Sequence, residues 1–209
     1  MKYPLVIFDF DGTLANSLPQ FAHNLHRLAD QYGFRKLSTA EMEELRSVDL
    51  RQLLRTMKIS FWKLPFIVRR IRKMMNEQIN QISLFPGIDQ SLQRLVDSGI
   101  RLAIVSSNSQ DNVQQILGPV NSKRFQFMEC SVSLFGKRSR LRRVLRNAQV
   151  AAEQAIYVAD ELRDLQAAKA EKLAFGAVSW GYVPGPTFSQ HHPDELFDSA
   201  ADMTDKLTR

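Results

Sequence analysis

Short apolar runs that alternate with helical segments constrain the fold of this chain more than any other feature of its sequence. The runs are rich in β-branched or small apolar residues, which is typical of strands buried on both faces. They are Leu5–Phe8, Leu102–Val105, Ala155–Ala159 and Ala174–Val178, with 127–132 as a weaker candidate. Helical segments lie between them, at about 87–98, 109–117, 137–148 and 162–171. This alternation predicts an α/β fold: a Rossmann-like parallel sheet core with helices on both faces.

Residues 15–83 interrupt the alternation, because no strand-like run stands out among them. Apolar residues recur there at helical spacing, as in Leu25, Leu28 and Ala29, and in Ile67, Ile71, Met74 and Met75. The pattern predicts an inserted all-helical domain at 15–83, with residues 1–14 and 84–209 forming the core. We expect Trp62 and Phe66 to belong to the hydrophobic core of the insertion.

Polar residues follow the apolar runs at the points where the predicted strands end. They are Asp9-Phe-Asp-Gly-Thr13, Ser106-Ser-Asn108, Lys137 and the segment from Asp160 to Asp164. Ligands of open parallel sheets bind beyond the carboxyl ends of the strands. Neighbouring strands are only ~4.8 Å apart, so we expect these side chains to meet around one small ligand.

Asp9 and Asp11 are the first pair of interest. A spacing of two residues places both side chains on the same side of an extended segment, and Gly12 then allows the chain to turn away. Two adjacent carboxylates repel each other unless a cation lies between them or one carries a proton. Magnesium, which binds through a few carboxylates and a phosphate group, is the predicted cofactor. Asp160 and Asp164 offer further oxygen ligands.

These residue types suggest phosphoryl transfer. Asp9 would attack phosphorus and form an aspartyl-phosphate, while Asp11 would protonate the leaving alcohol and then accept a proton from water. Magnesium and Lys137 would offset charge on the phosphoryl group, and Ser106 would donate its hydroxyl to a phosphate oxygen. Ser107 and Asn108 could contact phosphate through their main chain or could cap the following helix.

The four motifs resemble those of the haloacid dehalogenase-like hydrolase superfamily, in order and in spacing along the whole chain. Phe8-Asp-Phe-Asp-Gly-Thr-Leu14 is similar to its first motif, Ser106 to its second, Lys137 to its third and Asp160-x-x-x-Asp164 to its fourth. The helical insertion stands where this family carries a type-one cap, and the resemblance is strongest to the phosphoglycolate-phosphatase-like branch. It implies that the strand before Asp9 lies between the strands before Ser106 and Asp160. It also implies that the main-chain carbonyl of Asp11 binds the metal.

Three positions refine this expectation. Ala159 stands where the family usually has glycine, which adds a methyl group near the metal. Glu161 adds a third carboxylate beside Asp160 and Asp164, which we take as metal ligands together with Asp9 and Asp11. Asp11 is absent from the dehalogenase branch, and its presence favours a phosphatase acting on a small phosphorylated metabolite, phosphoglycolate-like or a sugar phosphate. A phosphomutase of the same superfamily is the alternative.

The charge distribution leaves another class of function open. The net charge is +6, and residues 51–76 contain eight Lys or Arg and no acid. A basic cap could grip nucleic acid or an anionic surface, attract an anionic phosphoester, or be simply a solvated face. We expect no nucleic-acid partner.

The remaining features point to the cytoplasm. Cys130 is the single cysteine, which excludes an internal disulfide and fits a reducing compartment. It lies in an apolar run and is expected to be a buried structural thiol. No signal peptide is visible, and the apolar runs are far shorter than the ~20 residues of a membrane span. The sequence leaves the oligomeric state open.

Overall fold

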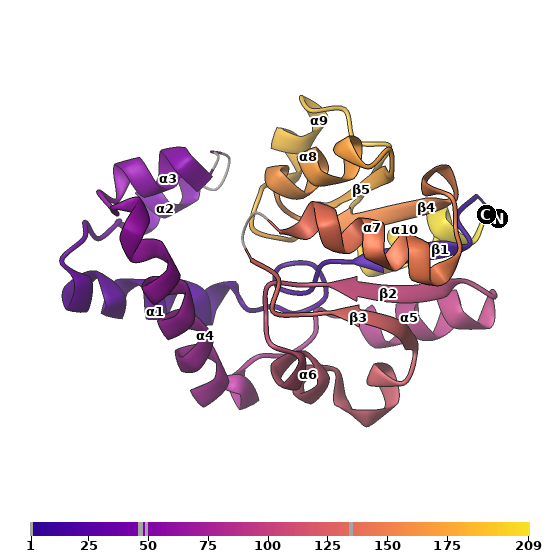
Figure 1. Cartoon of the computed structure of the whole chain (residues 1–209), viewed down its shortest axis with the longest axis horizontal. Coiled ribbons are helices and arrows are strands. Elements are labelled where there is room, and N and C mark those ends of the chain that lie inside the picture. The colour runs from indigo at the N-terminus through magenta and orange to yellow at the C-terminus, as the bar shows by residue number, and fades with distance from the viewer. Residues whose placement is uncertain (1, 46–47, 49, 134–135) are drawn as a thin grey trace.

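A six-stranded sheet forms the centre of the computed structural model, which describes residues 2–45, 48, 50–133 and 136–209 (Figure 1). The strands are β1 (Leu5–Phe8), β2 (Arg101–Val105), β3 (Phe125–Glu129), β4 (Ala155–Ala159), β5 (Ala174–Val178) and β6 (Glu195–Phe197). They pair in parallel in the order β3-β2-β1-β4-β5-β6. β1 therefore lies between β2 and β4, as the family resemblance implied, and the predicted Rossmann-like α/β class is confirmed.

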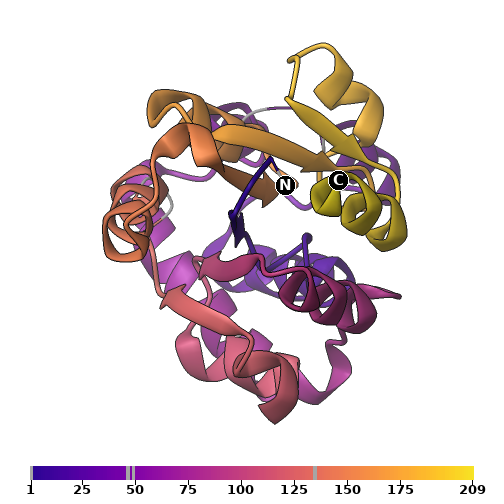
Figure 2. The same cartoon turned by 90° about the vertical axis from the view of Figure 1, so that its right-hand side faces the viewer.

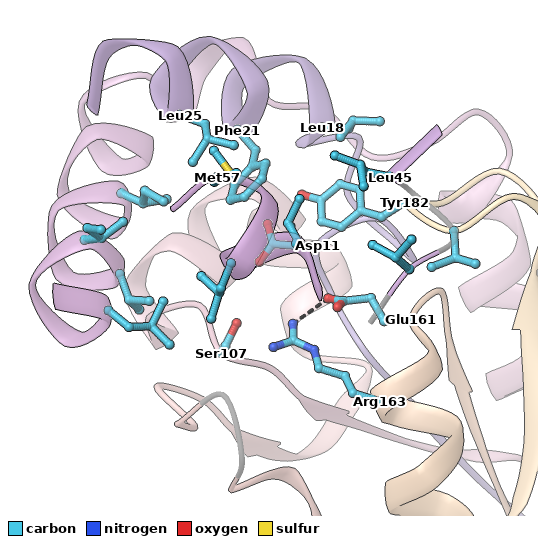
Figure 3. A pocket seen from close by; sticks show the side chains of 18 of the residues that line it. Asp11, Leu18, Phe21, Leu25, Leu45, Met57, Ser107, Glu161, Arg163 and Tyr182 are labelled. Carbon is cyan, nitrogen blue, oxygen red and sulfur yellow. Dashed lines mark hydrogen bonds and ion pairs between the residues drawn. The ribbon is translucent and has the colours of Figure 1, made fainter. Parts of the chain in front are cut away.

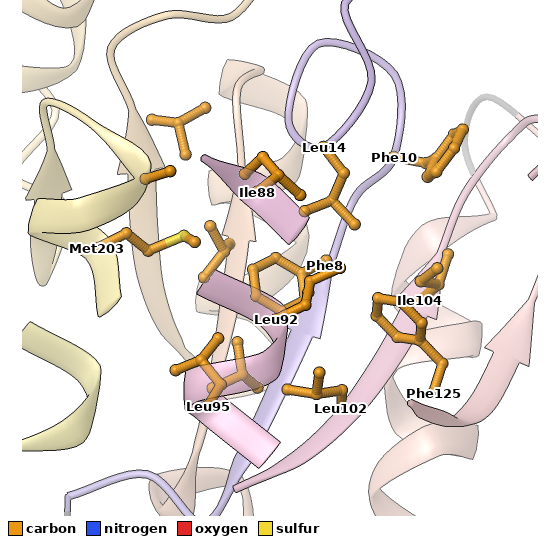
Figure 4. Packing of buried hydrophobic residues seen from close by; sticks show 14 of the residues in the cluster. Phe8, Phe10, Leu14, Ile88, Leu92, Leu95, Leu102, Ile104, Phe125 and Met203 are labelled. Carbon is orange, nitrogen blue, oxygen red and sulfur yellow. The ribbon is translucent and has the colours of Figure 1, made fainter. Parts of the chain in front are cut away.

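Helices cover both faces of this sheet, because alternate residues of β1 face opposite hydrophobic clusters. Val6 and Phe8 belong to one cluster and Leu5 and Ile7 to the other, and all four are fully buried. Figure 4 shows Phe8 packed among side chains of neighbouring strands and helices. The face of Val6 and Phe8 is covered by α5 (Ile88–Asp97), α6 (Gln110–Ser122) and α10 (Ala200–Thr208). The opposite face is covered by α7 (Lys137–Ala148), α8 (Leu162–Ala170) and α9 (Gly185–Ser189). A 3-10 turn, η4 (Ala152–Gln154), precedes β4.

Some elements of the core differ from the sequence prediction. β3 begins two residues earlier than the predicted run at 127–132, and β6, α9 and α10, which follow β5, were not predicted. β6 has only three residues in a polar segment, which is too short for a periodic signal. α10 could have been predicted from the sequence, because it has a capping residue and a helical pattern. Ser199 caps it by accepting a hydrogen bond from the main-chain N–H of Asp202 at 3.1 Å, and its buried residues recur at helical spacing.

All the regular elements described between positions 18 and 81 of the insertion are helices, joined by short loops. Its elements are α1 (Leu18–Tyr32), α2 (Thr39–Glu44), α3 (Leu50–Thr56), η2 (Phe61–Lys63), α4 (Leu64–Glu77) and η3 (Ile79–Gln81). It lies beyond the carboxyl ends of the strands, at the left in Figure 1, and Figure 2 views the molecule from the opposite end. The two connections to the core run side by side: Ala15 bridges Leu84, and the N–H of Asn16 donates to the carbonyl of Ser83 at 2.8 Å. The proposed boundaries at 15 and 83 fall at this bridge.

The expectation for two aromatic residues of the insertion is wrong. Trp62 is 68% exposed and Phe66 is 60% exposed, so neither belongs to a hydrophobic core. The buried side of α4 carries Ile67, Met74 and Met75 instead. Phe66 precedes Ile67 by one residue, and the ~100° turn per residue places it outside that face.

Candidate active site

The polar residues after β1, β2 and β4 meet at one edge of the sheet. Phe8, the last residue of β1, pairs with Ile104 of β2 and with Val158 of β4. Asp9 follows in the same extended direction, and its N–H donates to the carbonyl of Val158 at 2.9 Å. The expected convergence of the motifs therefore follows from the strand order.

Lys137 makes the closest charged contacts of the site. It is the first residue of α7, and its Nζ lies 2.6 Å from Oδ2 of Asp9 and 2.8 Å from Oδ1 of Asp164. All three side chains are buried. Burial works against the charged form of Lys137, but Asp164 and Asp9 outweigh it and hold the lysine pKa above its ordinary value. The site therefore contains a permanent cation in contact with Asp9.

Asp11 lies near Asp9 and is held by a residue whose role the sequence left undecided. The side-chain amide of Asn108 donates to both carboxylate oxygens of Asp11, at 3.3 and 3.1 Å. Burial raises the pKa of Asp11, opposed by hydrogen bonds from Ser17 and Asn108. A raised pKa favours the protonated form, the form that the predicted role of proton donor requires.

Asn108 is fixed in turn by its own neighbours. Its Oδ1 accepts from the main-chain N–H of Ser109 at 2.9 Å and from Nδ2 of Asn112 at 3.0 Å. Ser109, and not Ser107 or Asn108, supplies the side-chain cap of α6. The capping alternative is therefore wrong for the side chains of Ser107 and Asn108, and Asn108 emerges as a positioning residue for Asp11.

Ser106 and Ser107 occupy different environments. Ser106 is fully buried, and its Oγ accepts a hydrogen bond from the N–H of Asn108 at 3.0 Å. A hydroxyl that accepts one bond still has its own proton to donate. Ser107 is partly exposed and lines the cavity above the site (Figure 3).

Asp160 is held tightly on both carboxylate oxygens. Oδ1 accepts from the hydroxyl of Thr13 at 2.9 Å, and Oδ2 accepts from the N–H of Tyr182 at 2.7 Å. Two glycines make room for it: a Cβ at Gly12 would lie 2.1 Å from Oδ2, and one at Gly181 would lie 2.1 Å from the Cβ of Asp160. Asp160 thus ties the first motif to the loop after β5.

The acidic side chains that converge include two of the predicted metal ligands, Asp9 and Asp164, together with Glu161. Asp9, Glu161 and Asp164 each offer a carboxylate oxygen, and these atoms lie within 4.8 Å of one another. Such a group of hard oxygen donors fits a divalent cation like Mg²⁺. Glu161 also forms an ion pair with Arg163 (Figure 3). Asp160 stands outside this group as the site is arranged here.

The loop after β5 makes contacts with the segment 13–17 that no sequence motif predicted. Trp180 donates its indole N–H to the carbonyl of Thr13 at 3.0 Å, and the hydroxyls of Tyr182 and Ser17 lie 2.9 Å apart. The aromatic residues directly after an apolar run, at a further strand end, were the available signal. This loop buttresses the segment that carries Asp9 and Asp11.

Two expectations about single residues can be compared with their surroundings. Ala159 is fully buried in the hydrophobic cluster on the α7 and α8 face, so its methyl group packs in the core. Cys130 is only half-buried, and burial, with Glu129 and Asp11, raises its pKa to about 11. A protonated thiol is a poor nucleophile, which agrees with a structural role.

The basic side chains of α7 are partly neutralised by neighbouring acids. Arg138 and Arg142 pair with Glu171, and Arg140 and Arg143 pair with Glu129. No helix in the described part of the chain combines the length and the apolar composition that a membrane crossing requires.

Comparison with known proteins agrees with the fold and the motifs. A family model described as haloacid dehalogenase-like hydrolase matches residues 6–178. The chain therefore belongs to the haloacid dehalogenase-like hydrolases, and the family resemblance of its motifs is confirmed.

The curated relatives lie in the expected branch. A phosphoglycolate phosphatase from Synechococcus elongatus is 27% identical over 205 residues, covering 98% of this chain and 97% of the relative. A phosphoglycolate phosphatase from Vibrio cholerae is 26% identical over 209 residues, covering 93% and 92%. Among solved structures, a haloacid dehalogenase-like family hydrolase from Streptococcus pneumoniae has a TM-score of 0.80 at 20% identity, with 98% of each chain covered. Their likeness extends over nearly the whole chain.

The contact between Asn108 and Asp11 leads to a first prediction. If Asp11 is the proton donor, Asn108→Ala should lower kcat by about 10- to 100-fold for alkyl phosphates, because Asp11 loses the amide that orients it. The loss should be much smaller for p-nitrophenyl phosphate, whose leaving group needs little protonation. Steady-state kinetics on both esters test this, and an equal loss on both would assign Asn108 a purely structural role.

Proposed function

We propose that this protein is a magnesium-dependent phosphatase that hydrolyses a phosphomonoester through an aspartyl-phosphate on Asp9. The observation that supports it best is the position of Asp9 at the end of the central strand. There it contacts the cation of Lys137 and lies next to Asp11, which has a raised pKa. The family and the curated relatives, which are phosphatases, agree with this chemistry.

The proposed reaction has two displacements at phosphorus. In the first, a carboxylate oxygen of Asp9 bonds to phosphorus, the bond from phosphorus to the ester oxygen breaks, and Asp11 gives its proton to the departing alcohol. In the second, water attacks phosphorus while Asp11 takes its proton, and the bond to Asp9 breaks. Inorganic phosphate leaves, and both aspartates return to their starting states.

Other side chains would hold the phosphoryl group between these steps. The ammonium group of Lys137 offsets its negative charge, and the hydroxyl of Ser106 donates to one of its oxygens. Ser107 offers further donors at the mouth of the site. Burial raises the pKa of Asp9, and the contact with Lys137 opposes that effect and favours the ionised nucleophile.

The acidic group formed by Asp9, Glu161 and Asp164 would hold Mg²⁺, together with the main-chain carbonyl of Asp11 that the family resemblance implies. Bound there, the metal supplies positive charge that offsets the phosphoryl oxygens. Each carboxylate oxygen of Asp160 accepts one hydrogen bond, from Thr13 or from the N–H of Tyr182, which fixes its orientation. We place Glu161 among the ligands because its oxygen lies with those of Asp9 and Asp164, and we give Asp160 a positioning role.

Release of inorganic phosphate tests the proposal. The purified protein, supplied with magnesium, should release phosphate from a panel that contains 2-phosphoglycolate, sugar phosphates and p-nitrophenyl phosphate. Conversion of a phosphosugar into its isomer without phosphate release would instead identify a phosphomutase. Lack of both reactions across the panel would contradict the proposed chemistry.

One basic residue of the cap is placed to affect substrate capture. Arg72 lines the cavity above the site, and its guanidinium donates to the carbonyl of Val132 at 3.1 Å. Arg69 is exposed on the same helix and lies outside that lining. Comparing substitutions of Arg72 and Arg69 therefore distinguishes a charge that faces the site from a charge on the solvated side of α4.

We expect Arg72→Gln to lower kcat/KM for a dianionic ester by about tenfold at low salt, and by less at high salt, because screening weakens attraction over distance. Arg69→Gln is the matched control and should leave kcat/KM unchanged. The measurement is kcat/KM at two ionic strengths for both variants. Equal values for both variants and the parent protein would rule out steering by this helix.

A further inference from the structure

A large cavity joins the catalytic carboxylates to the interior of the cap. Its volume is about 300 Å³, and its lining runs from Asp9 and Asp11 into the helices of the insertion. In Figure 3 the apolar side chains of Leu18, Phe21 and Leu25 stand above Asp11, together with Met57 and Leu45. The space above the nucleophile is thus continuous with a chamber inside the cap.

The walls of this chamber are apolar because three helices turn their hydrophobic stripes toward it. On α4 the lining residues Leu64, Ile67, Val68 and Ile71 recur at helical spacing. On α1 the same spacing holds for Leu18, Phe21 and Leu25, and α3 adds Leu53 and Leu54. Leu28, Ala29 and Met74 lie outside the lining and pack in the cap core.

Polar groups gather at the opposite end, next to the nucleophile. They come mainly from the core: Asp9, Asp11, Ser107, Asn108, Glu161, Arg163, Gln166 and Tyr182. Among the described cap residues, Arg72 is the charged side chain in the lining, and Arg69, Arg70 and Lys73 stay outside it. A second anionic group on a small substrate would therefore meet mostly Leu, Ile, Met and Phe in the cap.

We propose that the substrate is the phosphomonoester of an alcohol with an extended apolar chain. The phosphate would lie at Asp9 and Lys137, the ester oxygen beside Asp11, and the chain among the apolar residues of α1, α3 and α4. This inference rests on the proposed phosphatase function and specifies the alcohol. It favours an amphiphilic substrate over phosphoglycolate or a sugar phosphate, whose polar groups would lose hydration in the chamber without gaining partners.

A series of n-alkyl phosphates from ethyl to dodecyl tests the inference, with 2-phosphoglycolate and glucose 6-phosphate beside it. Each buried methylene contributes ~0.8 kcal/mol, so kcat/KM should rise about fourfold per added methylene until the chamber is full. All chain lengths are assayed below their critical micelle concentrations. A flat profile, or highest kcat/KM for 2-phosphoglycolate, would overturn the proposal.

A variant that fills the chamber provides a second test of the proposed apolar substrate. Val68 is half-buried and lines the cavity from α4, so Val68→Phe should shorten the preferred chain and lower kcat/KM for long esters by at least tenfold. The loss should grow with chain length and be smallest for ethyl phosphate. Val120→Phe makes the same change at a 65% exposed position on α6 and should leave the profile unchanged. An unaltered chain-length profile in a folded Val68→Phe protein would contradict the proposal.

Binding of n-alkyl phosphonates separates this inference from the proposed function. Phosphonates keep the phosphorus–carbon bond, so calorimetry reports affinity independently of turnover. If affinity rises with chain length while no ester is hydrolysed, the chamber binds apolar chains and the phosphatase assignment fails. If esters are hydrolysed while affinity is independent of chain length, the phosphatase assignment holds and the apolar substrate is excluded.

Discussion

Asp9→Asn is expected to reduce phosphate release by on the order of 10⁴-fold or more, because an amide oxygen cannot take the place of the attacking carboxylate. The substitution keeps the size of a side chain that is 5% exposed. Oδ1 of Asp9 accepts from the N–H of Phe10 at 2.8 Å, and an amide oxygen can keep that bond. The amide nitrogen would then face the ammonium group of Lys137, which retains Asp164 as its partner.

The fold of the variant must be checked alongside its activity, since one charge of a buried ion pair is lost. Circular dichroism and a thermal melt serve for this. Asp11→Asn is the matched comparison: it should hydrolyse alkyl phosphates poorly but still form the phosphoenzyme from p-nitrophenyl phosphate. Beryllium fluoride should bind the parent protein and fail to bind Asp9→Asn. Turnover near the parent rate in a folded Asp9→Asn sample would remove Asp9 from the role of nucleophile.

The core of this site could be predicted from the sequence because strand ends impose geometry. Leu5–Phe8 is apolar on both faces, which predicts a central strand, and this strand places Asp9 and Asp11 just beyond its end. The family resemblance, and not the apolar pattern, implied that the strands before Ser106 and Asp160 lie on either side of it. Short parallel strands leave little freedom in where their last residues lie.

Side-chain directions were harder to predict, because they depend on contacts between distant segments. The bonds of Asp160 to Thr13 and to the N–H of Tyr182 follow from a close packing that Gly12 and Gly181 permit. No local pattern around Asp160 shows which oxygens will be occupied. For the same reason the convergence of Glu161 with Asp9 and Asp164 was visible only after folding.

The cap shows a further limit of sequence patterns. Helical spacing identified Ile67, Ile71, Met74 and Met75 as one apolar face. A periodic pattern cannot tell whether such a face meets another helix or an open chamber. In the structure Met74 packs in the cap core, while Ile67 and Ile71 also line the cavity.

Removal of the metal is the second change that is expected to have a large effect on phosphate release. A chelator should abolish phosphate release, and added Mg²⁺ should restore it, because the carboxylates of Asp9, Glu161 and Asp164 converge without a matching number of cations. Calcium should inhibit, since its larger and looser coordination shell can engage both oxygens of Asp9 and blunt the attack. A rate that is unchanged by the chelator would show that the metal proposal is wrong.

Two substitutions then decide whether Glu161 or Asp160, the two acids after β4, binds the metal. If Glu161 is a ligand, Glu161→Gln should raise the magnesium concentration for half-maximal activity by at least about tenfold. Asp160→Asn should chiefly lower the melting temperature, because its amide can accept only one of the two bonds from Thr13 and Tyr182. The titrations are compared at saturating substrate. The reverse result, with the magnesium requirement raised in Asp160→Asn and unchanged in Glu161→Gln, would mean that Asp160, and not Glu161, binds the metal.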